Sequence, residues 1–267
     1  MVSVFFVFST FFGWMSSLTY AFTLFLILFL IFTLVIATVT LIERKILALT
    51  QRRVGPNYIG YKGRLQFMAD ALKLILKHIT VLPKTNRLFF LFLPVSICFI
   101  SYTFWVNLIW GPNLQFVEVE YNLLVVGLLS SFYSLLLIIV GFITKNKYAS
   151  LASTRVVITT LLLELLFISF MIILAYLCEC LNFALLKTYQ THFRINFWIF
   201  APLMPLMFAT FFLETGRLPY DFQEAESELI SGYSTEFGGF YFALFYLGEY
   251  FHLYSFSVVY AICLFGG

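Results

Sequence analysis

The chain has 267 residues, of which 62% are hydrophobic and only 11% charged, and its mean hydropathy is +0.97. Average soluble domains are about 45–50% apolar and about 25% charged, so a water-soluble fold of this length would expose too much apolar surface. The four cysteines are too few for a disulfide scaffold, and their spacing does not fit a CxxC metal or redox site: Cys98, Cys178, Cys180 and Cys263. The composition therefore predicts an integral membrane protein.

The first 42 residues contain no Lys, Arg, Asp, Glu or His. Secretory signals begin with basic residues and mitochondrial presequences contain several arginines, so this start does not resemble a cleavable targeting peptide. The apolar run 2–12 is short for a transmembrane helix. We interpret residues 1–19 as an N-terminal extension compatible with an extra tilted or interfacial membrane helix, and Gly13 with Ser16–Ser17 predicts a break after that run.

Six later segments are long and apolar enough to cross a membrane, which takes about 20 residues in a helix. They are residues 20–42, 88–110, 121–143, 156–177, 195–213 and 238–262. We therefore expect an all-α, polytopic membrane helix bundle, in which residues 20–267 form a single membrane domain. The many phenylalanines and tyrosines, 35 and 16, indicate AT-rich coding DNA and favour an organelle-encoded gene.

The basic residues predict the orientation of these spans. Fourteen of the sixteen Lys and Arg lie in the loops 43–87, 144–155 and 214–237, whereas the loops 111–120 and 178–194 hold only Lys187 and Arg194. Basic residues are enriched in loops on the inner side of a membrane, so the first, third and fifth loops should face inwards. In a mitochondrion the inner side is the matrix.

The first inner loop contains an amphipathic pattern. Gln66, Asp70, Lys73 and Lys77 recur at helical spacing, with apolar residues on the opposite side of the same helix: Leu65, Met68, Leu72, Ile75 and Ile79. This pattern predicts an interfacial helix in the first inner loop. A simple anchor on anionic lipid is one reading of it.

Glu164 lies in the middle of the predicted fourth span. A carboxylate at the centre of a bilayer costs about 2.5–3.5 kcal/mol on insertion scales, so such a group should face the bundle interior or water. Burial favours the protonated form of a carboxyl group, which suits a role in proton transfer. A structural carboxylate held by a neighbouring polar group is the alternative. Glu249, early in the sixth span, is a second case, and Glu43 at the end of the first span is a weaker one.

The fifth loop concentrates acidic residues on the basic side of the membrane. Six of the thirteen acids lie there with a single arginine, Arg217, to balance them: Glu214, Asp221, Glu224, Glu226, Glu228 and Glu236. On a helix after Pro219, Asp221, Glu224 and Glu228 would share one face. Crowded like charges titrate as a coupled set, so the cluster suits a site that responds to a nearby charge, although acidic loops are often only solvated.

No other catalytic motif is recognisable. His78, His192 and His252 have no partner at haem or zinc spacing, and the sequence lacks a GxGxxG or P-loop motif. We therefore expect the chain to bind no redox centre of its own, and any electron transfer to belong to partner proteins.

Two long stretches resemble the quinone-binding membrane subunit, subunit 1, of mitochondrial NADH:ubiquinone oxidoreductase (respiratory complex I). They are ERKILALTQRRVGPNYIGYKGRLQFMADALKLILK, residues 43–77, and ETGRLPYDFQEAESELISGYSTEFGGFYFALFYLGEY, residues 214–250. Arg155 followed by Glu164 also matches the family's fourth span. The resemblance runs from about residue 20 to the end of the sequence.

The resemblance implies a role in a proton-pumping enzyme of the mitochondrial inner membrane. The family forms a ubiquinone access tunnel together with quinone-site subunits of the peripheral arm, and a path of carboxylates leads from it towards other membrane subunits. By resemblance, the tunnel residues are Arg44, Arg53, Ala71 and Phe242, and the carboxylate path is Glu43, Glu164, Glu214, Asp221, Glu224 and Glu249. The supporting residues are Arg155, Arg217, Asp70, Glu226 and Glu228. Ubiquinone is then the substrate, FMN and iron-sulfur clusters belong to partner subunits, membrane lipids are further partners, and no nucleic acid is expected.

Several positions depart from the family pattern. Gly216 stands where Asn is usual, Val54 replaces a basic residue, Phe67 a proline and His78 a glutamate. The family has eight spans, and the last two are absent here. We therefore expect a separate chain to supply them beside residues 238–262, because TM helices can associate after independent insertion.

Three other functions compete with this one. A membrane subunit of an energy-converting hydrogenase would share the fold, but the long GPN loop and the ESELISG segment favour the quinone enzyme. A free-standing secondary transporter would show inverted repeats with broken spans, which the sequence does not contain. A passive assembly scaffold does not explain why none of these departures removes an acid of the carboxylate path.

Overall fold

The structure is a computed structural model that describes residues 2–78, 85–111, 114–115, 119–193, 204–217 and 232–265. The chain divides into two units, Met1–Ala71 and Leu72–Gly267, and each is described by itself.

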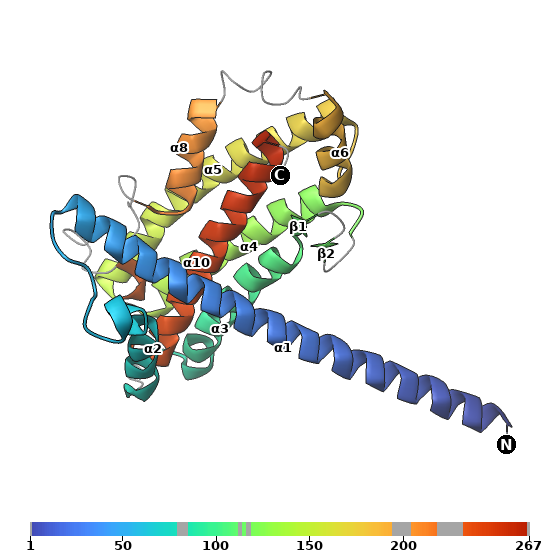
Figure 1. The fold of residues 1–267 in the computed structure, drawn as a ribbon, viewed down its shortest axis with the longest axis horizontal. Coiled ribbons are helices and arrows are strands. Elements are labelled where there is room, and N and C mark those ends of the chain that lie inside the picture. The colour runs from blue at the N-terminus through green and yellow to red at the C-terminus, as the bar shows by residue number, and fades with distance from the viewer. Residues whose placement is uncertain are drawn as a thin grey trace. The chain divides into compact units, whose positions relative to one another are not determined.

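The first unit is dominated by one long helix, α1, which runs without interruption from Val2 to Thr50 (Figure 1). The predicted break at Gly13 and Ser16–Ser17 is therefore wrong, because neither glycine nor serine prevents an apolar segment in a membrane from closing its own backbone hydrogen bonds. The expected span 20–42 lies within α1, and Phe22–Thr50 is apolar enough to cross a bilayer.

The chain leaves α1 through a tight C-terminal cap. Arg52 adopts a left-handed conformation with φ of 54°, and the Arg53 N–H donates to the carbonyl of Ala48 at 2.9 Å. This is the Schellman arrangement that ends many helices. A short 3₁₀ turn, Tyr61–Gly63, follows, and Gly63 has φ of 73°. A Cβ at Gly63 would lie 2.0 Å from the Pro56 carbonyl oxygen, so only glycine fits this loop.

Helix α2, Gln66–Leu76, confirms the helix predicted in the first inner loop. No residue of α2 is buried, and its apolar residues Met68, Leu72 and Ile75 are all exposed. An exposed apolar stripe on a short helix is typical of a helix that lies at a membrane interface.

The second unit is a bundle in which α3, α4, α5 and α10 run side by side (Figure 1). Helix α3 spans Arg87–Val106, α4 Asn122–Ile143, α5 Lys147–Cys178 and α10 Phe240–Tyr260, and a π-helical turn, Ala261–Phe265, extends α10. The shorter apolar helix α8, Met204–Glu214, packs on α5. Helices α3, α4 and α10 overlap the predicted spans 88–110, 121–143 and 238–262, and each is long and apolar enough to cross a membrane. Residues 195–203 of the predicted fifth span lie outside the described part of the chain.

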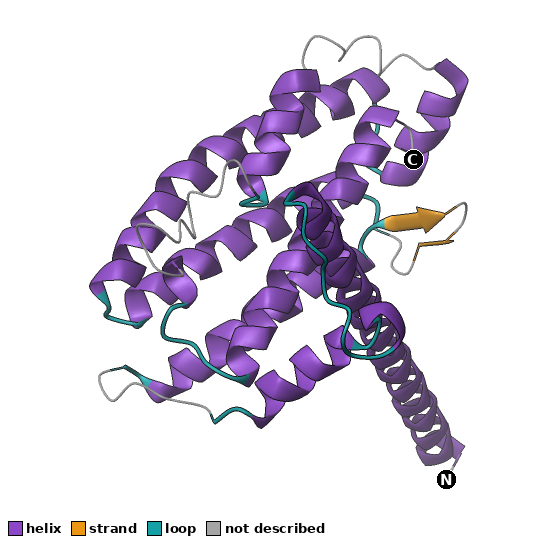
Figure 2. Ribbon diagram, turned by 60° about the vertical axis from the view of Figure 1, so that its left-hand side comes forward, coloured by secondary structure: helices purple, strands orange, loops and turns teal. Residues whose placement is uncertain are grey.

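Two loops contain secondary structure that the sequence pattern did not predict. Residues 178–194 include helix α6, Phe183–Phe193, and a two-stranded antiparallel hairpin joins β1, Ile109–Gly111, to β2, Leu114–Gln115 (Figure 2). The 3₁₀ turn η3, Gly232–Ser234, precedes α10.

Helix α5 begins nine residues before the predicted fourth span, so most of the expected loop 144–155 is helical. With 32 residues it is about 48 Å long, which exceeds the roughly 30 Å of a hydrocarbon core. The extra turns carry Lys147 and Arg155, which suit the interface rather than the bilayer interior. The Asn146 side chain caps the N-terminus of α5 by accepting a hydrogen bond from the Tyr148 N–H at 3.2 Å. Hydropathy does not reveal where α5 begins, because this start is set by a capping hydrogen bond.

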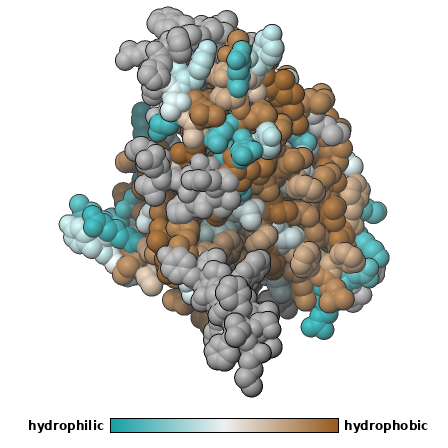
Figure 3. Space-filling model, turned by 90° about the vertical axis from the view of Figure 1, so that its right-hand side faces the viewer, coloured by the Kyte–Doolittle hydropathy of each residue, from teal (hydrophilic) through white to brown (hydrophobic). Residues whose placement is uncertain are grey.

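The surface of the bundle is apolar where lipid would lie. Apolar residues cover most of the visible face in Figure 3. On α5 the exposed side chains include Leu162, Leu165 and Ile172, whereas Leu163, Phe167 and Leu174 of the same helix are buried. Helix α5 therefore has one side in the bundle and one side that could face lipid, whereas on α10 only Phe240 and Tyr246 are exposed.

Inside the bundle, aromatic rings fill the space between α3 and α10. The Trp105 indole donates to the carbonyl of Phe251 at 2.5 Å, and Tyr102 packs edge-on against the Phe251 ring with centroids 5.6 Å apart. An indole N–H buried among apolar groups needs such a partner. These contacts fix the position of α10, which carries Glu249.

Helices α4 and α5 approach each other closely at Gly141. A Cβ built there would lie 2.5 Å from Cβ of Ser153 and 2.6 Å from the carbonyl oxygen of Ala149. Small residues at a crossing allow two helix backbones to approach, which is how many membrane helices associate. Gly127, on the same helix, has open space: its nearest neighbour would be Ile168 at 3.9 Å.

We expect Gly141→Ala to lower the thermal stability of the protein purified from its native membrane in mild detergent. The added methyl group forces the two backbones apart, and overpacking of this kind costs about 1–3 kcal/mol. Gly127→Ala makes the same change where space exists, and alanine favours a helix by up to about 1 kcal/mol over glycine. A melting temperature for Gly141→Ala that equals that of Gly127→Ala would contradict the close packing.

Candidate functional site

Glu164 lies near the middle of α5, and its carboxylate faces α4. The Ser134 hydroxyl donates a hydrogen bond to Oε1 of Glu164, and the same hydroxyl lies 2.9 Å from the carbonyl oxygen of Ser131. Ser134 is buried and Glu164 half-buried. The structure places Glu164 against a polar group of the bundle, which both the expected proton-transfer role and the structural alternative allow, and sequence periodicity alone did not single out Ser134 as that group. The role of Glu164 stays a prediction.

Glu214, the last residue of α8, is the second carboxyl group of the same region. Its Oε2 oxygen is buried and has no hydrogen-bond partner among the described residues. Burial raises the pKa of the Glu214 carboxyl group to about 8, and the negative charge of Glu164 adds to this effect. A carboxyl group in such surroundings can bind and release a proton near neutral pH.

The chain turns sharply directly after Glu214. Gly216 is left-handed, with φ of 59°, and the Arg217 N–H donates to the carbonyl of Phe212 at 3.2 Å, which ends α8 in the same manner as α1 ends. Asn also tolerates this conformation, so Gly216 in place of the family's usual Asn preserves the turn. The turn places the Arg217 guanidinium over the Tyr250 ring, 4.5 Å from its centroid, which is a cation–π contact.

Glu249, on α10, is the third carboxyl group. The Tyr233 hydroxyl donates a hydrogen bond to its Oε1 oxygen, and Tyr233 is itself buried. Tyr233 belongs to the turn η3, which follows the acidic stretch of the fifth loop. Tyr250, which carries the Arg217 cation on its ring, is the next residue after Glu249. Arg155, the second supporting arginine, is half-buried on α5.

One turn beyond Glu249, α10 carries a buried histidine. The His252 ring stacks on Tyr133 of α4, with centroids 3.9 Å apart and planes 12° from parallel. Its Nε2 nitrogen has no hydrogen-bond partner among the described residues. Tyr133 immediately precedes Ser134, the residue that donates to Glu164. The stack therefore connects α10, which carries Glu249, to the part of α4 that contacts Glu164. The sequence did not predict this contact, because a single histidine in an apolar span does not reveal which ring it packs against.

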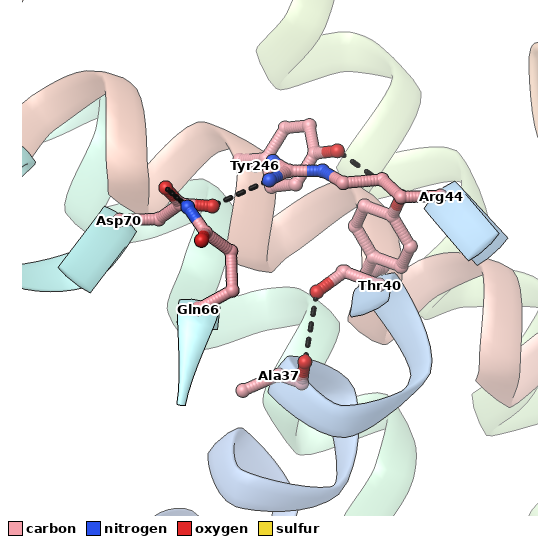
Figure 4. Close-up of polar contacts among 7 residues, drawn as sticks. Ala37, Thr40, Arg44, Gln66, Asp70 and Tyr246 are labelled. Atoms are coloured by element: carbon pink, nitrogen blue, oxygen red, sulfur yellow. Dashed lines mark hydrogen bonds and ion pairs between the residues drawn. The ribbon is translucent and has the colours of Figure 1, made fainter. Parts of the chain in front are cut away.

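In the first unit, the residues predicted at the tunnel and at the start of the path lie at the end of α1 and in the loop after it. Arg44 and Asp70 form an ion pair, and the Gln66 amide donates to Oδ1 of Asp70 at 3.0 Å (Figure 4). The Lys45 ammonium donates to the carbonyl of Lys62 at 2.6 Å. Exposed ion pairs contribute about 0–1 kcal/mol, so these contacts orient Arg44 more than they stabilise the fold.

The remaining predicted residues have simpler surroundings. Glu43 is half-buried on α1, and Arg53 and Ala71 are exposed. Phe242, at the start of α10, is half-buried and its ring lies 6.4 Å from that of Tyr246. Four predicted acids lie outside the described residues: Asp221, Glu224, Glu226 and Glu228.

The described part of the chain contains no cluster of three or more His, Cys, Asp or Glu placed to hold a metal ion. What it does contain is three carboxyl groups on three different helices, two of them with a hydroxyl donor and the third beside a like charge. Carboxyl groups in such surroundings can exchange protons, and their protonation responds to charges nearby.

Comparisons with known proteins identify the family of the chain. The family model described as NADH dehydrogenase matches residues 22–267. Among curated relatives, NADH-ubiquinone oxidoreductase chain 1 of Paramecium tetraurelia is 47% identical over 241 residues, which cover 90% of this chain and 92% of that protein. The chain 1 proteins of Yarrowia lipolytica and Chondrus crispus are 36% and 34% identical, and the matches cover 87% of this chain in both cases and 68% and 71% of those proteins. This chain therefore belongs to the NADH dehydrogenase family, and its sequence is similar to that of NADH-ubiquinone oxidoreductase chain 1 along nearly all of its length.

Proposed function

We propose that this chain is a membrane subunit of proton-pumping NADH:ubiquinone oxidoreductase in the mitochondrial inner membrane, encoded in the organelle. In this role it forms part of the ubiquinone access tunnel and of the carboxylate path that couples quinone reduction to proton translocation. Its partners are other membrane subunits, the quinone-site subunits of the peripheral arm and membrane lipids, and FMN and iron-sulfur clusters belong to partner subunits. The observation that carries the proposal is the Glu164–Glu214 pair.

The pair is suited to coupling because it is sensitive to charge. A unit charge that appears about 10 Å away changes the energy of ionising a carboxyl group by about 1.7 kcal/mol at an effective dielectric constant of about 20. That is more than a tenfold change in proton affinity. Reduction of ubiquinone to ubiquinol takes up two electrons and two protons, so it necessarily passes through states of different charge. A buried carboxyl group such as that of Glu214 converts such a charge into the binding or release of a proton.

The basic residues of the first unit suit the other half of the function. Arg53 is exposed in the loop directly after α1, and Arg44 is held by Asp70 on the same part of the chain. Exposed guanidinium groups can hold the polar head of a quinone and the acidic residues of a neighbouring subunit. The exposed apolar side chains of α2 add a surface on which an isoprenoid tail can rest.

The first test replaces the paired acids. We expect Glu164→Gln and Glu214→Gln to leave assembly largely intact but to lower NADH:ubiquinone reductase activity or its linked proton translocation at least fivefold, because glutamine cannot bind and release a proton. Glu179→Gln, an exposed acid at the other end of α5, is the matched control. Both quantities are measured on the purified enzyme reconstituted in vesicles. Normal activity together with a normal proton-to-electron ratio in both variants would refute the role of the pair.

The second test concerns the tunnel. We expect Arg53→Ala to lower ubiquinone reduction severalfold, while electron transfer from NADH to a hydrophilic artificial acceptor persists, because such acceptors take electrons before the membrane subunit. Arg87→Ala removes another exposed arginine, at the start of α3, and should change neither rate. If Arg53→Ala reduces both rates equally, the variant has disturbed assembly and the tunnel assignment loses its support.

A further inference from the structure

The residues Gly232–Phe237, which we call the latch segment, carry the tyrosine that contacts Glu249. The segment begins with the turn η3 and ends just before α10. Tyr233, Ser234 and Phe237 are buried, and the Phe237 N–H donates to the carbonyl of Ser234 at 3.0 Å. The segment belongs to no membrane span, so its position depends on side-chain contacts with its neighbours.

One of these contacts is apolar. The Phe237 ring stacks on Phe90 of α3 with centroids 4.2 Å apart and planes 7° from parallel, and it packs edge-on against Phe245 of α10 at 4.7 Å. Tyr233 also packs edge-on against Phe245, at 6.1 Å. Ring contacts of this kind hold the segment against α3 and α10 and add to the stabilisation from buried apolar area.

The other contact is directional. The Asn146 amide nitrogen donates to Oε1 of Glu236 at 2.5 Å, and the Asn146 amide oxygen accepts from the Tyr148 N–H at 3.2 Å. Asn146 is thus fixed at the start of α5 by its oxygen and holds the latch segment by its nitrogen. Because the partner is a carboxylate, the hydrogen bond is of the stronger, charge-assisted kind.

We propose that Asn146 and Glu236 are positioning residues for Glu249: their hydrogen bond holds the latch segment so that the Tyr233 hydroxyl stays on the Glu249 carboxylate. Tyr233 and Glu236 are three residues apart in one short turn, so a shift of Glu236 moves Tyr233 with it. The Asn146–Glu236 hydrogen bond at the start of α5 therefore determines whether Glu249 on α10 keeps its hydrogen bond from the Tyr233 hydroxyl. The proposal rests on the function proposed above, since it assigns Glu249 to the coupling path.

The exchange of donor and acceptor tests the hydrogen bond itself. Asn146→Asp keeps the oxygen that caps α5 but places a carboxylate against Glu236, so the latch segment should be released. Adding Glu236→Gln restores a donor, now on residue 236, opposite the acceptor on residue 146. Glu236→Gln alone keeps an acceptor oxygen for Asn146 and should have the smaller effect. Asn86→Asp makes the same substitution at the exposed start of α3, where the asparagine side chain caps nothing.

The variants are compared in the assembled enzyme in vesicles, by the pH profile of NADH:ubiquinone reductase activity and by the proton-to-electron ratio. We expect Asn146→Asp to lower coupled activity at least threefold and to change its pH profile, the double variant to return to within twofold of the unmodified enzyme, and Asn86→Asp to change nothing. The proposal would be overturned if Asn146→Asp had the same activity and pH profile as Asn86→Asp. It would also be overturned if the double variant were as impaired as Asn146→Asp.

A second comparison links the hydrogen bond to Glu249. Tyr233→Phe removes the donor directly, so it should produce the same pH profile as Asn146→Asp, and combining the two should add no further loss. Residues that act through one contact are non-additive, whereas independent sites add. Additive losses would show that Asn146 acts only on the stability of the fold and would refute the positioning role.

Two controls keep the outcomes distinct. If Asn146→Asp prevents assembly, Glu236→Ala and Glu236→Gln replace it: the proposal requires alanine, which has no acceptor, to change the pH profile more than glutamine does, and equal profiles refute it. The unmodified preparation tests the proposed function separately, because an absence of NADH:ubiquinone reductase activity in the complex that contains this chain would refute that function before any variant is compared.

Discussion

An acid in an apolar bundle must find a hydrogen-bond donor or share its proton, and this constraint governs the arrangement of the second unit. Glu164 has the Ser134 hydroxyl and Glu249 has the Tyr233 hydroxyl, whereas burial and, to a lesser extent, the charge of Glu164 favour the protonated form of Glu214. The cost of an unpaired carboxylate in hydrocarbon is several times the net gain from an ordinary hydrogen bond. The helices that carry these residues must therefore be held in register by other contacts, such as the Trp105–Phe251 hydrogen bond and the close approach at Gly141.

The spans and the interfacial helix could be predicted from the sequence because each depends on the hydropathy of its own residues. The start of α5 could not, since it depends on a cap at Asn146, and α6 could not, because its mixed residues form a helix only on a surface that the rest of the chain creates. The break expected near Gly13 failed for a related reason. In lipid no water is present to form hydrogen bonds with backbone groups that leave a helix. A glycine that would weaken a helix in water therefore leaves α1 continuous.

The candidate site was predicted as a set of acids, and the structure adds their neighbours. The sequence did not identify Ser134 as the donor to Glu164. A serine in a helix can instead donate its hydroxyl hydrogen to a carbonyl three or four residues earlier, as Ser130 and Ser131 do. Likewise His252 shares its helix face with apolar rings, and only the stack on Tyr133 distinguishes it from a core residue. The split of the family's last two spans onto another chain, and the acids from Asp221 to Glu228, remain predictions.

The left-handed turn at Gly216 restricts what can vary in this part of the chain. The residue carries no charge, yet it places the Arg217 guanidinium over the ring of Tyr250, the residue next to Glu249 in the sequence. A β-branched residue would be strained at φ of 59°, and the arginine would then leave the ring although no ionisable residue had changed. Sequence changes at this position in other organisms should therefore be read as changes to the electrostatics of the site, and only glycine, asparagine and aspartate should be regarded as interchangeable there.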